Sequence, residues 1–260
     1  MIDTDPLSGA REALLDHLPK AAVLARYQVA GGQELVSGKF ANPEASAALV
    51  ANAFGLFADR PQALSLPGLV APGDARRVDL EVEMRFPWRG GYHPWLDLAV
   101  ETDNLLIGVE SKRYEPFRDG KAAVFSPAYS RPVWGQAMGG FEAMRDSLSA
   151  GQSFEFLDAA QLVKHALGLQ TQAHRKGRRA ILCYLYAEPD AYPDGRTISP
   201  SAIAGHRAEL AAFAAEVTEA LAEVAFCGLT YGRLLQHWSG LPGLADHARA
   251  LAARCEIGAP

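Results

Sequence analysis

The sequence predicts an α/β protein in which helices pack on both sides of a mixed central β-sheet. Three segments predict the sheet: "VDLEVEMRF" (78–86) alternates apolar and polar residues, "WLDLAVETDNLLIGVESKR" (95–113) has the pattern of two strands joined by a short turn, and "AILCYLYA" (180–187) is continuously apolar. A continuous apolar run is typical of a strand that is covered on both faces. The order helix, three strands, helix, strand, helix therefore favours a mixed sheet between helical layers.

Two helices are expected before the first strand. Apolar residues recur at helical spacing over residues 10–27, which predicts one amphipathic helix there. A second helix is expected to begin in "NPEASAALVANAF", with Asn42 as N-cap, Pro43 at the first helical position and Glu44 in the first turn. It should end near Phe57.

The strands have distinct expected faces. Strict alternation places five apolar residues on one face of the first strand: Val78, Leu80, Val82, Met84 and Phe86. The next two strands, 95–101 and 105–113, are hinged at residues 102–104. Leu96, Leu98 and Val100 should share one face, and Asp97 should lie on the other.

The remaining elements are mainly helical. A short helix is expected over residues 138–148, followed by a long one with Asp158 as N-cap and Gly177 as its stop. After the strand at 180–187, a helix capped by Ser199 and Pro200 should cover the Ala-rich stretch 202–225. Smaller helices are expected around residues 233 and 248. Nothing marks a second domain, so residues 1–260 are expected to form one domain.

Composition restricts the class of protein. The formal charge of −5 argues against nonspecific coating of nucleic acid, which requires a clustered basic surface. The three cysteines are widely spaced and form no C-x-x-C pair, which indicates a reduced, cytoplasmic chain. No signal peptide is recognisable and no apolar run approaches the roughly 18 residues that span a bilayer, so neither secretion nor a membrane partner is expected.

Charged residues interrupt the apolar strands of 95–113. Asp97 lies on one strand, and Glu110 and Lys112 share a face of the next, so pairing of the strands would bring the three together. A buried charge is costly unless it is paired or holds a metal ion. Two carboxylates suit Mg²⁺, with Mn²⁺ as a substitute, and leave positions for water and a phosphate oxygen. The lysine could stabilise developing negative charge. The alternative is a salt-bridged strand pair in which Lys112 neutralises both acids.

The pattern Asp97, twelve intervening residues, then Glu110-Ser111-Lys112 resembles the PD-(D/E)XK nuclease superfamily. Pro94 stands three residues before the aspartate, so the Pro-Asp pair of that family is relaxed, and a second [DE]-x-K occurs at residues 119–121. "ANPEASAALVANAFG", "LDLAVETDNLLIGVESKRYE" and "DAAQLVKHALGL" are similar to stretches of a bacterial family of uncharacterised, restriction-endonuclease-like proteins. The resemblance implies a restriction-endonuclease-like, three-layer α/β/α core over about residues 43–187, with helical additions at 1–30 and 200–260.

The same resemblance implies a function and helper residues. It implies a Mg²⁺-dependent nuclease, endo- or exonucleolytic, with nucleic acid, and DNA in particular, as its partner. Asp97 and Glu110 would bind metal and Lys112 would be catalytic. Glu44 would join the metal site from the first core helix, and Gln161 would face it from the helix after the third strand. Both also have simpler explanations, since an acid in a first turn complements the helix dipole and Gln161 could lie on a solvated face.

Other residues and functions stay open. His165 and His93 are weaker site candidates, and the basic run "HRKGRR" (174–179) either complements a helix C-terminus or contacts phosphates, together with Arg113, Arg118 and Lys121. The alternatives to a nuclease are a non-catalytic nucleic-acid-binding or scaffold protein with the same fold, and an interaction domain whose acids are merely paired. The sequence leaves the oligomeric state open, with a homodimer as one option, and gives no substrate specificity.

Overall fold

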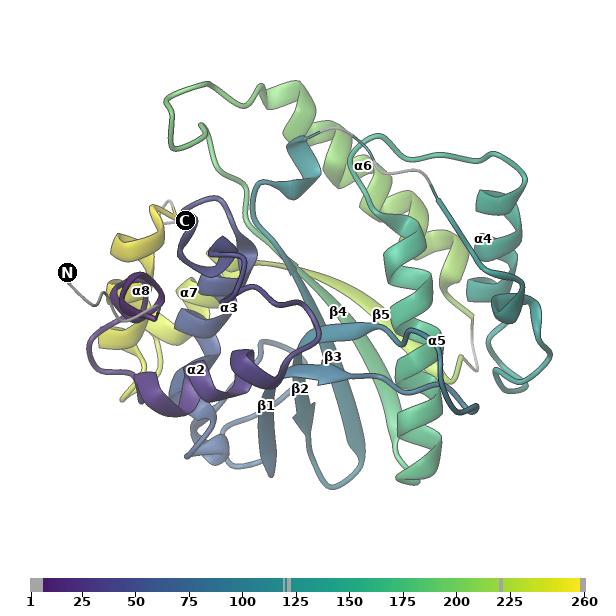
Figure 1. The fold of residues 1–260 in the computed structure, drawn as a ribbon, viewed down its shortest axis with the longest axis horizontal. Coiled ribbons are helices and arrows are strands. Elements are labelled where there is room, and N and C mark those ends of the chain that lie inside the picture. Colours follow the sequence, from purple (N-terminus) through teal and green to yellow (C-terminus); the bar gives the residue numbers. More distant parts are fainter. Residues whose placement is uncertain (1–6, 119, 121–122, 220–221, 258–260) are drawn as a thin grey trace.

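A computed structural model describes residues 7–118, 120, 123–219 and 222–257. Its centre is one five-stranded mixed sheet with the strand order β1-β2-β3-β4-β5 (Figure 1). The strands β1, β2 and β3 pair antiparallel, and β3, β4 and β5 pair parallel. Their bounds are Arg77–Glu83, Trp95–Glu101, Leu105–Lys112, Arg179–Tyr186 and Val224–Thr230.

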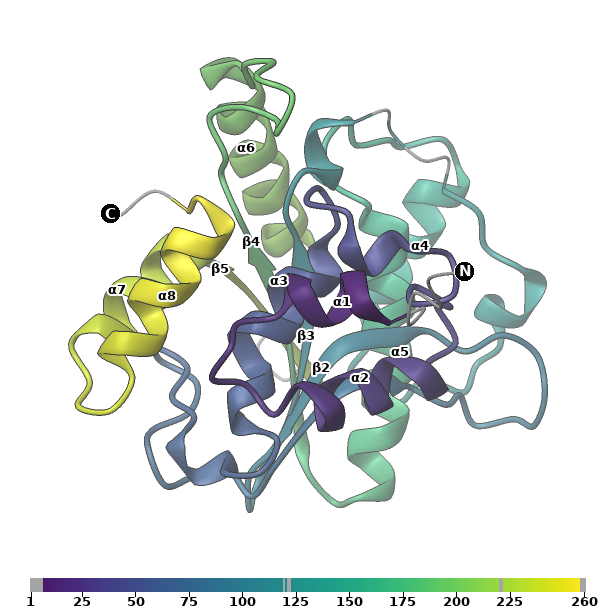
Figure 2. The same ribbon diagram turned by 60° about the vertical axis from the view of Figure 1, so that its left-hand side comes forward.

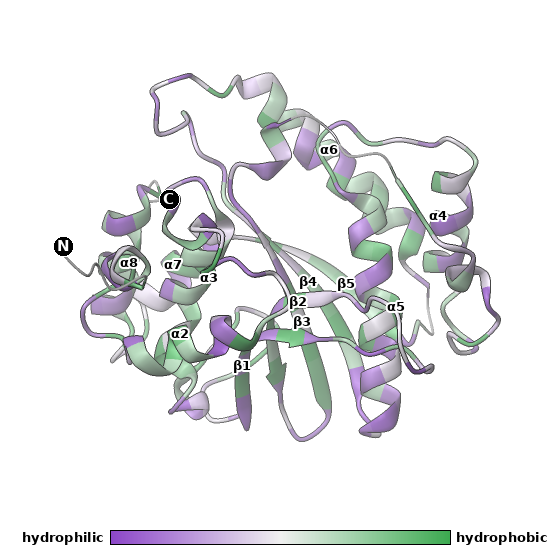
Figure 3. Ribbon diagram, in the orientation of Figure 1, coloured by the Kyte–Doolittle hydropathy of each residue, from purple (hydrophilic) through white to green (hydrophobic). Residues whose placement is uncertain are grey.

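Helices cover both faces of this sheet, so the molecule has three layers (Figures 1 and 2). One layer contains α1 (Ser8–Ala13), α2 (Lys20–Val29), α3 (Ser46–Phe54), α7 (Tyr231–Ser239) and α8 (Ala245–Cys255). The other contains α4 (Gly139–Ser149), α5 (Ala159–Arg175) and α6 (Pro200–Val217). Short 3₁₀ turns lie between them at Lys39–Ala41, Gly55–Phe57, Pro61–Ala63, Glu115–Phe117 and Pro127–Ser130. Each layer encloses one hydrophobic cluster, named here the first core and the second core respectively. Figure 3 shows the apolar strands between the two layers.

The predicted α/β class and mixed sheet are confirmed. The β2–β3 hairpin forms where expected, with residues 102–104 between the strands. Asp158 caps α5 by accepting a hydrogen bond from the Gln161 amide (2.9 Å), and Gly177 follows the helix with a φ of +63°. Ser199 caps α6, and α4, α7 and α8 lie at the predicted places. Among the residues that the structure describes, no helix is both long and apolar enough to cross a membrane.

The predicted first helix over 10–27 is wrong. The chain forms α1 and α2 with a break at residues 14–19, where Leu14 is extended (φ −90°, ψ 143°). Pro19 immediately precedes α2, and a proline in a helix interior lacks the amide that the helix needs. Both short helices contribute residues to the first core.

The predicted start of the second helix is also wrong. The N-cap of α3 is Ala45, and Glu44 lies outside the helix. Asn42 forms a local turn instead, because its side chain accepts a hydrogen bond from the Glu44 amide (2.9 Å) and its carbonyl accepts one from Ala45 (3.0 Å). This competition between a side-chain turn and a helix cap is typical of asparagine.

Strand β5 was not predicted, because the Ala-rich stretch was expected to be helical through residue 225. The helix ends at Val217, and Val224–Thr230 pairs with β4 as an edge strand. This short strand contains Gly228, and its buried and exposed residues do not alternate, so it gives a weak periodic signal.

The predicted faces of β1 and β2 are correct up to Glu81 on β1 and its neighbour Asp97 on β2, and wrong on the far side of these two residues. Val78 and Leu80 pack in the first core as expected, but Met84 and Phe86 pack in the second. On β2, Leu98 and Val100 lie in the first core and Leu96 in the second. Glu81 has a φ of +51°, which turns the strand over and reverses the alternation after it. The apolar side of β1 therefore changes faces at Glu81. The pairs Leu80–Leu98 and Val82–Leu96 flank this point, so Glu81 lies opposite Asp97 of β2.

Candidate active site

The charged residues of the hairpin meet where β3 ends and β2 begins. Glu110 and Lys112 are in register with Tyr184 and Tyr186 of β4, and Asp97 approaches from β2. The Asp97 Oδ2 atom accepts a hydrogen bond from the backbone amide of Ser111 (2.6 Å). The structure thus brings Asp97, Glu110 and Lys112 to one end of the two strands.

Glu110 is the most deeply buried of these acids. Its side chain is 3 % exposed, and Lys112 Nζ lies 2.5 Å from its Oε1 atom. His165, from α5 and also buried, places Nδ1 at 3.1 Å from Oε2. Burial acts to raise the pKa of Glu110, but Lys112 and His165 outweigh it and lower the pKa to about 2. Glu110 is therefore ionised at neutral pH.

Asp97 has the opposite tendency. Burial, and then the charges of Glu110 and Glu81, raise the pKa of Asp97 well above its usual value. Lys112 and the Ser111 amide oppose this increase without cancelling it. Burial acts to lower the pKa of Lys112, but Glu110 and Asp97 raise it, so the lysine stays charged. Lys112 thus lowers the pKa of both acids, but the net result is a decrease for Glu110 and an increase for Asp97.

Two further acids belong to this cluster and were missed in the sequence. Burial, followed by Glu34 and Glu110, raises the pKa of Glu81 to about 8. Burial and then Glu115 raise the pKa of Glu34, whose buried Oε2 atom has no hydrogen-bond partner among the described residues. Strict alternation had placed Glu81 on a solvated strand face. The available signal was that antiparallel pairing of the first two strands places Glu81 opposite Asp97.

Glu115 ties the cluster to the first core. Its carboxylate accepts hydrogen bonds from the Arg113 amide (2.7 Å) and from the Ser46 amide (3.2 Å) at the first residue of α3. Ser111, between Glu110 and Lys112, turns the other way and its hydroxyl lies 2.8 Å from the Tyr231 hydroxyl. Both contacts fix the end of β3 against neighbouring helices.

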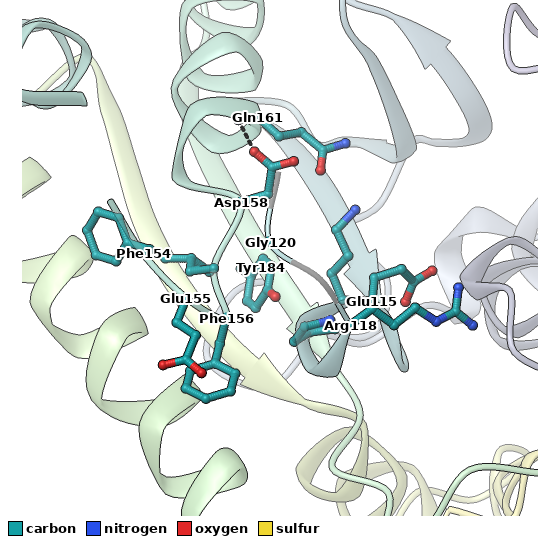
Figure 4. Close-up of a pocket in the computed structure, with 12 residues that line it drawn as sticks. Glu115, Arg118, Gly120, Phe154, Glu155, Phe156, Asp158, Gln161 and Tyr184 are labelled. Carbon is teal, nitrogen blue, oxygen red and sulfur yellow. Dashed lines mark hydrogen bonds between the residues drawn. The ribbon is translucent and has the colours of Figure 1, made fainter. Parts of the chain in front are cut away.

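A small pocket opens beside Lys112 (Figure 4). Its lining includes Gln161, Tyr184, Glu115 and Arg118. Figure 4 shows the Gln161 carboxamide on the opposite side of this pocket from Glu115 and Arg118. The predicted Gln161 therefore shares a pocket with Lys112, because the Asp158 cap begins α5 at this end of the sheet.

Glu44 lies at the rim rather than with the other acids. Its carboxylate forms an ion pair with Arg118, which lines the pocket, and the Glu44 side chain is 27 % exposed. Glu44 precedes the N-cap of α3, so it is not the first-turn acid that the sequence predicted. Glu44 is thus connected to the pocket through Arg118.

The weaker sequence candidates have structural partners. His93 is buried and its Nδ1 accepts a hydrogen bond from the Phe86 amide (3.2 Å), so it stabilises the β1–β2 loop. In the basic run, Lys176 and Arg178 pair with Glu101, and Arg179 is in register with Leu105, at the opposite end of β3 from Lys112. Arg113 donates to the carbonyls of Pro43 and Cys255. Residues 119 and 121 lie outside the described residues.

The donor set is suited to a hard divalent cation. All the acids of the cluster offer carboxylate oxygens, the ligands that Mg²⁺ prefers, and the Glu34 Oε2 atom has no hydrogen-bond partner in the part of the chain that the structure describes. In the described part of the chain, no three His, Cys, Asp or Glu side chains are grouped closely enough to hold a metal ion as they stand. Lys112 and His165 engage both oxygens of Glu110 in this arrangement, so a cation would have to compete with them.

Comparisons with family models, with curated proteins and with solved structures return no match for this chain.

Proposed function

We propose that the protein is a metal-dependent nuclease that hydrolyses phosphodiester bonds of nucleic acid, with DNA as the expected substrate, on a restriction-endonuclease-like core. The observation that carries the proposal is the excess of buried acid at one end of β2 and β3. Raised pKa values at Asp97 and Glu81 mean that the cluster holds more carboxylates than the charge of Lys112 can neutralise. Carboxyl groups with strongly shifted pKa values are typical of functional sites.

The residues have separate roles in this proposal. Asp97 and Glu110 would hold Mg²⁺ or Mn²⁺, which supplies Lewis-acid polarisation of a phosphate oxygen and a more acidic bound water. Lys112 would stabilise the negative charge that develops on the phosphate, because its amine stays protonated and borders the pocket. Gln161 would orient the phosphate or the attacking water from the opposite wall. Glu44 would assist by holding Arg118 at the rim.

One observation supports the alternative of a non-catalytic nucleic-acid-binding or scaffold protein. Glu110 already has a partner at each oxygen, so the cluster is partly neutralised without any cation. In that case the site would contribute to the stability of the sheet and nucleic acid would bind without being cut.

Cleavage assays separate the two functions. Wild-type protein is incubated with circular single-stranded DNA, plasmid DNA and structured RNA in Mg²⁺, Mn²⁺ or EDTA. Asp97→Asn is compared with Glu101→Gln, a control on the same strand whose acid pairs with Lys176 and Arg178 far from the pocket. The proposal expects metal-dependent cleavage that Asp97→Asn abolishes and Glu101→Gln retains. Equal cleavage by both variants, or binding without cleavage in every metal, contradicts it.

A further inference from the structure

A second surface of the molecule combines aromatic rings with arginines. It lies where the β1–β2 loop meets residues 123–134, on the side of the sheet that carries α5. We name it the aromatic–basic surface and define it by Trp88, Arg89, Tyr92, Phe125, Tyr129 and Arg131. Tyr92 is fully exposed (101 %), Arg89 and Arg131 are exposed, and the other three are half-buried.

This surface has a rigid floor. Phe86 and Trp134 are each 1 % exposed and belong to the second core. Trp88 packs against both of them, with ring centroids at 4.9 and 5.3 Å, and Tyr129 packs against Phe86 at 5.4 Å. The half-buried rings are therefore held in place by a packed core and keep one side toward solvent.

The β1–β2 loop is also fixed to α5. Gln172 and Arg175 donate hydrogen bonds to the carbonyls of Arg85 and Phe86, at 2.5 and 3.0 Å. Gly168 permits close approach, because a Cβ at this position would lie 2.8 Å from the Cβ of Met84. These contacts hold the base of the loop that carries Trp88 and Tyr92.

The charge of the surface is positive, although the whole chain is acidic. Arg131 stacks over the Trp88 ring with its Cζ 4.7 Å from the centroid, and Lys164 Nζ lies 5.3 Å from the Phe125 centroid. Within the described residues, neither Arg89 nor Arg131 forms an ion pair, and the nearby Glu83 is paired with Arg85. A ligand that is both anionic and aromatic would complement these cations and the exposed ring of Tyr92 beside them.

The aromatic–basic surface adjoins the candidate site along α5. Gln161, which lines the pocket of Lys112, and Lys164, which contacts Phe125 and Tyr129, are separated by less than one helical turn. Residues three apart on a helix are neighbours at roughly 5–6 Å. A flexible chain could therefore lie across both places.

We propose that the aromatic–basic surface binds single-stranded nucleic acid and thereby makes unpaired strands the substrate class of the site. The proposal rests on the proposed nuclease function for its substrate role. Bases in a duplex are stacked on one another and cannot stack on the exposed Tyr92 ring or on the Arg131 guanidinium that covers Trp88. An unpaired strand offers both free bases and phosphates. The surface thus favours unpaired strands over duplex in a way that arginines alone would not.

The test measures binding in EDTA, where no metal-dependent cleavage occurs. Fluorescence anisotropy at fixed salt compares a labelled oligo-dT, an oligo-U, a DNA duplex of equal length and a polyglutamate peptide. The variants are Tyr92→Ala, Tyr92→Trp and Arg131→Gln, with Arg249→Gln as a matched control, since Arg249 is an exposed arginine of α8 on the other side of the sheet. Tyr92 is fully exposed, so its variants leave the core unchanged.

The expected result is tighter binding of a single strand than of duplex. Tyr92→Ala and Arg131→Gln should each weaken it about tenfold, and Tyr92→Trp and Arg249→Gln should retain it. The oligo-dT and oligo-U arms distinguish DNA from RNA. Equal binding of duplex and single strand, no effect of Tyr92→Ala, or preference for polyglutamate overturns the proposal. Failure of the nuclease function has a different signature, namely single-strand binding with no cleavage in Mg²⁺ or Mn²⁺.

Discussion

Lys112 and Glu110 project from the same face of β3 and form an ion pair in which Nζ and Oε1 are 2.5 Å apart. Both side chains are largely buried, so neither charge is well solvated when its partner is removed. The nearby Asp97 carboxyl, with its raised pKa, competes for the same amine. This pair is therefore the place where stability and the proposed chemistry are most directly linked.

Lys112→Ala should separate these two contributions. Without metal, we expect a loss of about 3 kcal/mol in the free energy of unfolding, because breaking a buried ion pair leaves an uncompensated charge. Mg²⁺ should restore much of the loss by neutralising the acids, while cleavage stays at least a hundredfold lower. Urea unfolding and cleavage assays, each with and without Mg²⁺, measure the two effects. A stability loss that Mg²⁺ leaves untouched would instead indicate a purely structural salt bridge.

Glu81→Gln should remove part of the pH dependence of stability. The pKa of Glu81 is raised from its ordinary 4.5 to about 8 in the folded protein, so the folded state retains a proton that the unfolded state releases. Its contribution to stability is thus fully present below pH 4.5 and is lost as the pH rises through about 8. The metal-free wild type should melt at lower temperature at pH 8 than at pH 6, and the variant should show a smaller difference. Identical slopes for both proteins would contradict the burial of this acid.

His165→Ala should destabilise the fold by about 2 kcal/mol, because it leaves one oxygen of the buried Glu110 carboxylate without its partner. The pKa of Glu110 should rise for the same reason, since His165 is among the groups that lower it. Urea unfolding at neutral pH measures the loss, and NMR titration of the carboxyl measures the pKa. His165→Gln, which retains a donor, should partly restore the free energy of unfolding and the pKa of Glu110. If His165→Gln and His165→Ala behave alike, the contact with Glu110 does not cause the loss of stability.

Gln161→Ala should lower turnover without changing metal affinity, because an amide is a poor Mg²⁺ ligand beside carboxylates. The backbone amide of Gln161 still reaches the Asp158 cap in this variant, so α5 should remain intact. Isothermal titration with Mg²⁺ and single-turnover cleavage measure the two quantities. Normal turnover would remove Gln161 from the site.

Glu44→Gln should change the free energy of unfolding by less than about 1 kcal/mol, since the pair with Arg118 is partly exposed. If Glu44 acts by holding Arg118 at the rim, turnover should fall while the Mg²⁺ dissociation constant is unchanged. The same assays apply, and Arg118→Gln should reproduce the loss. A weaker Mg²⁺ affinity in Glu44→Gln alone would instead make Glu44 a direct ligand.

The sequence was most informative where local signals determine structure. The β2–β3 hairpin, the Asp158 cap and the stop at Gly177 all depend on residues within a few positions of one another. The convergence of Asp97, Glu110 and Lys112 followed from alternation and one short turn. These features could be predicted because each has a specific local cause.

The errors arose where tertiary contacts override the local pattern. No periodicity indicates that Glu81 adopts a positive φ, which is uncommon for a residue other than glycine. The reversal accompanies the packing of Met84 and Phe86 in the second core, and it is also why Glu81 was missed. The start of α3 was misplaced because the Asn42 turn replaces the predicted cap, and because Glu115, distant in sequence, binds the Ser46 amide of the first turn.

The reversal at Glu81 also links the thermal stability of the protein to the acids of the candidate site. A strand with uninterrupted alternation would cover each side of the sheet with a continuous apolar layer and leave no interior place for carboxylates. By changing sides within β1, the chain brings Glu81 and Asp97 to the border between its two cores, and burial there raises the pKa of both acids. Apolar substitutions at these two positions are the ones most expected to raise the melting temperature and, by the same change, to remove whatever chemistry the acids perform.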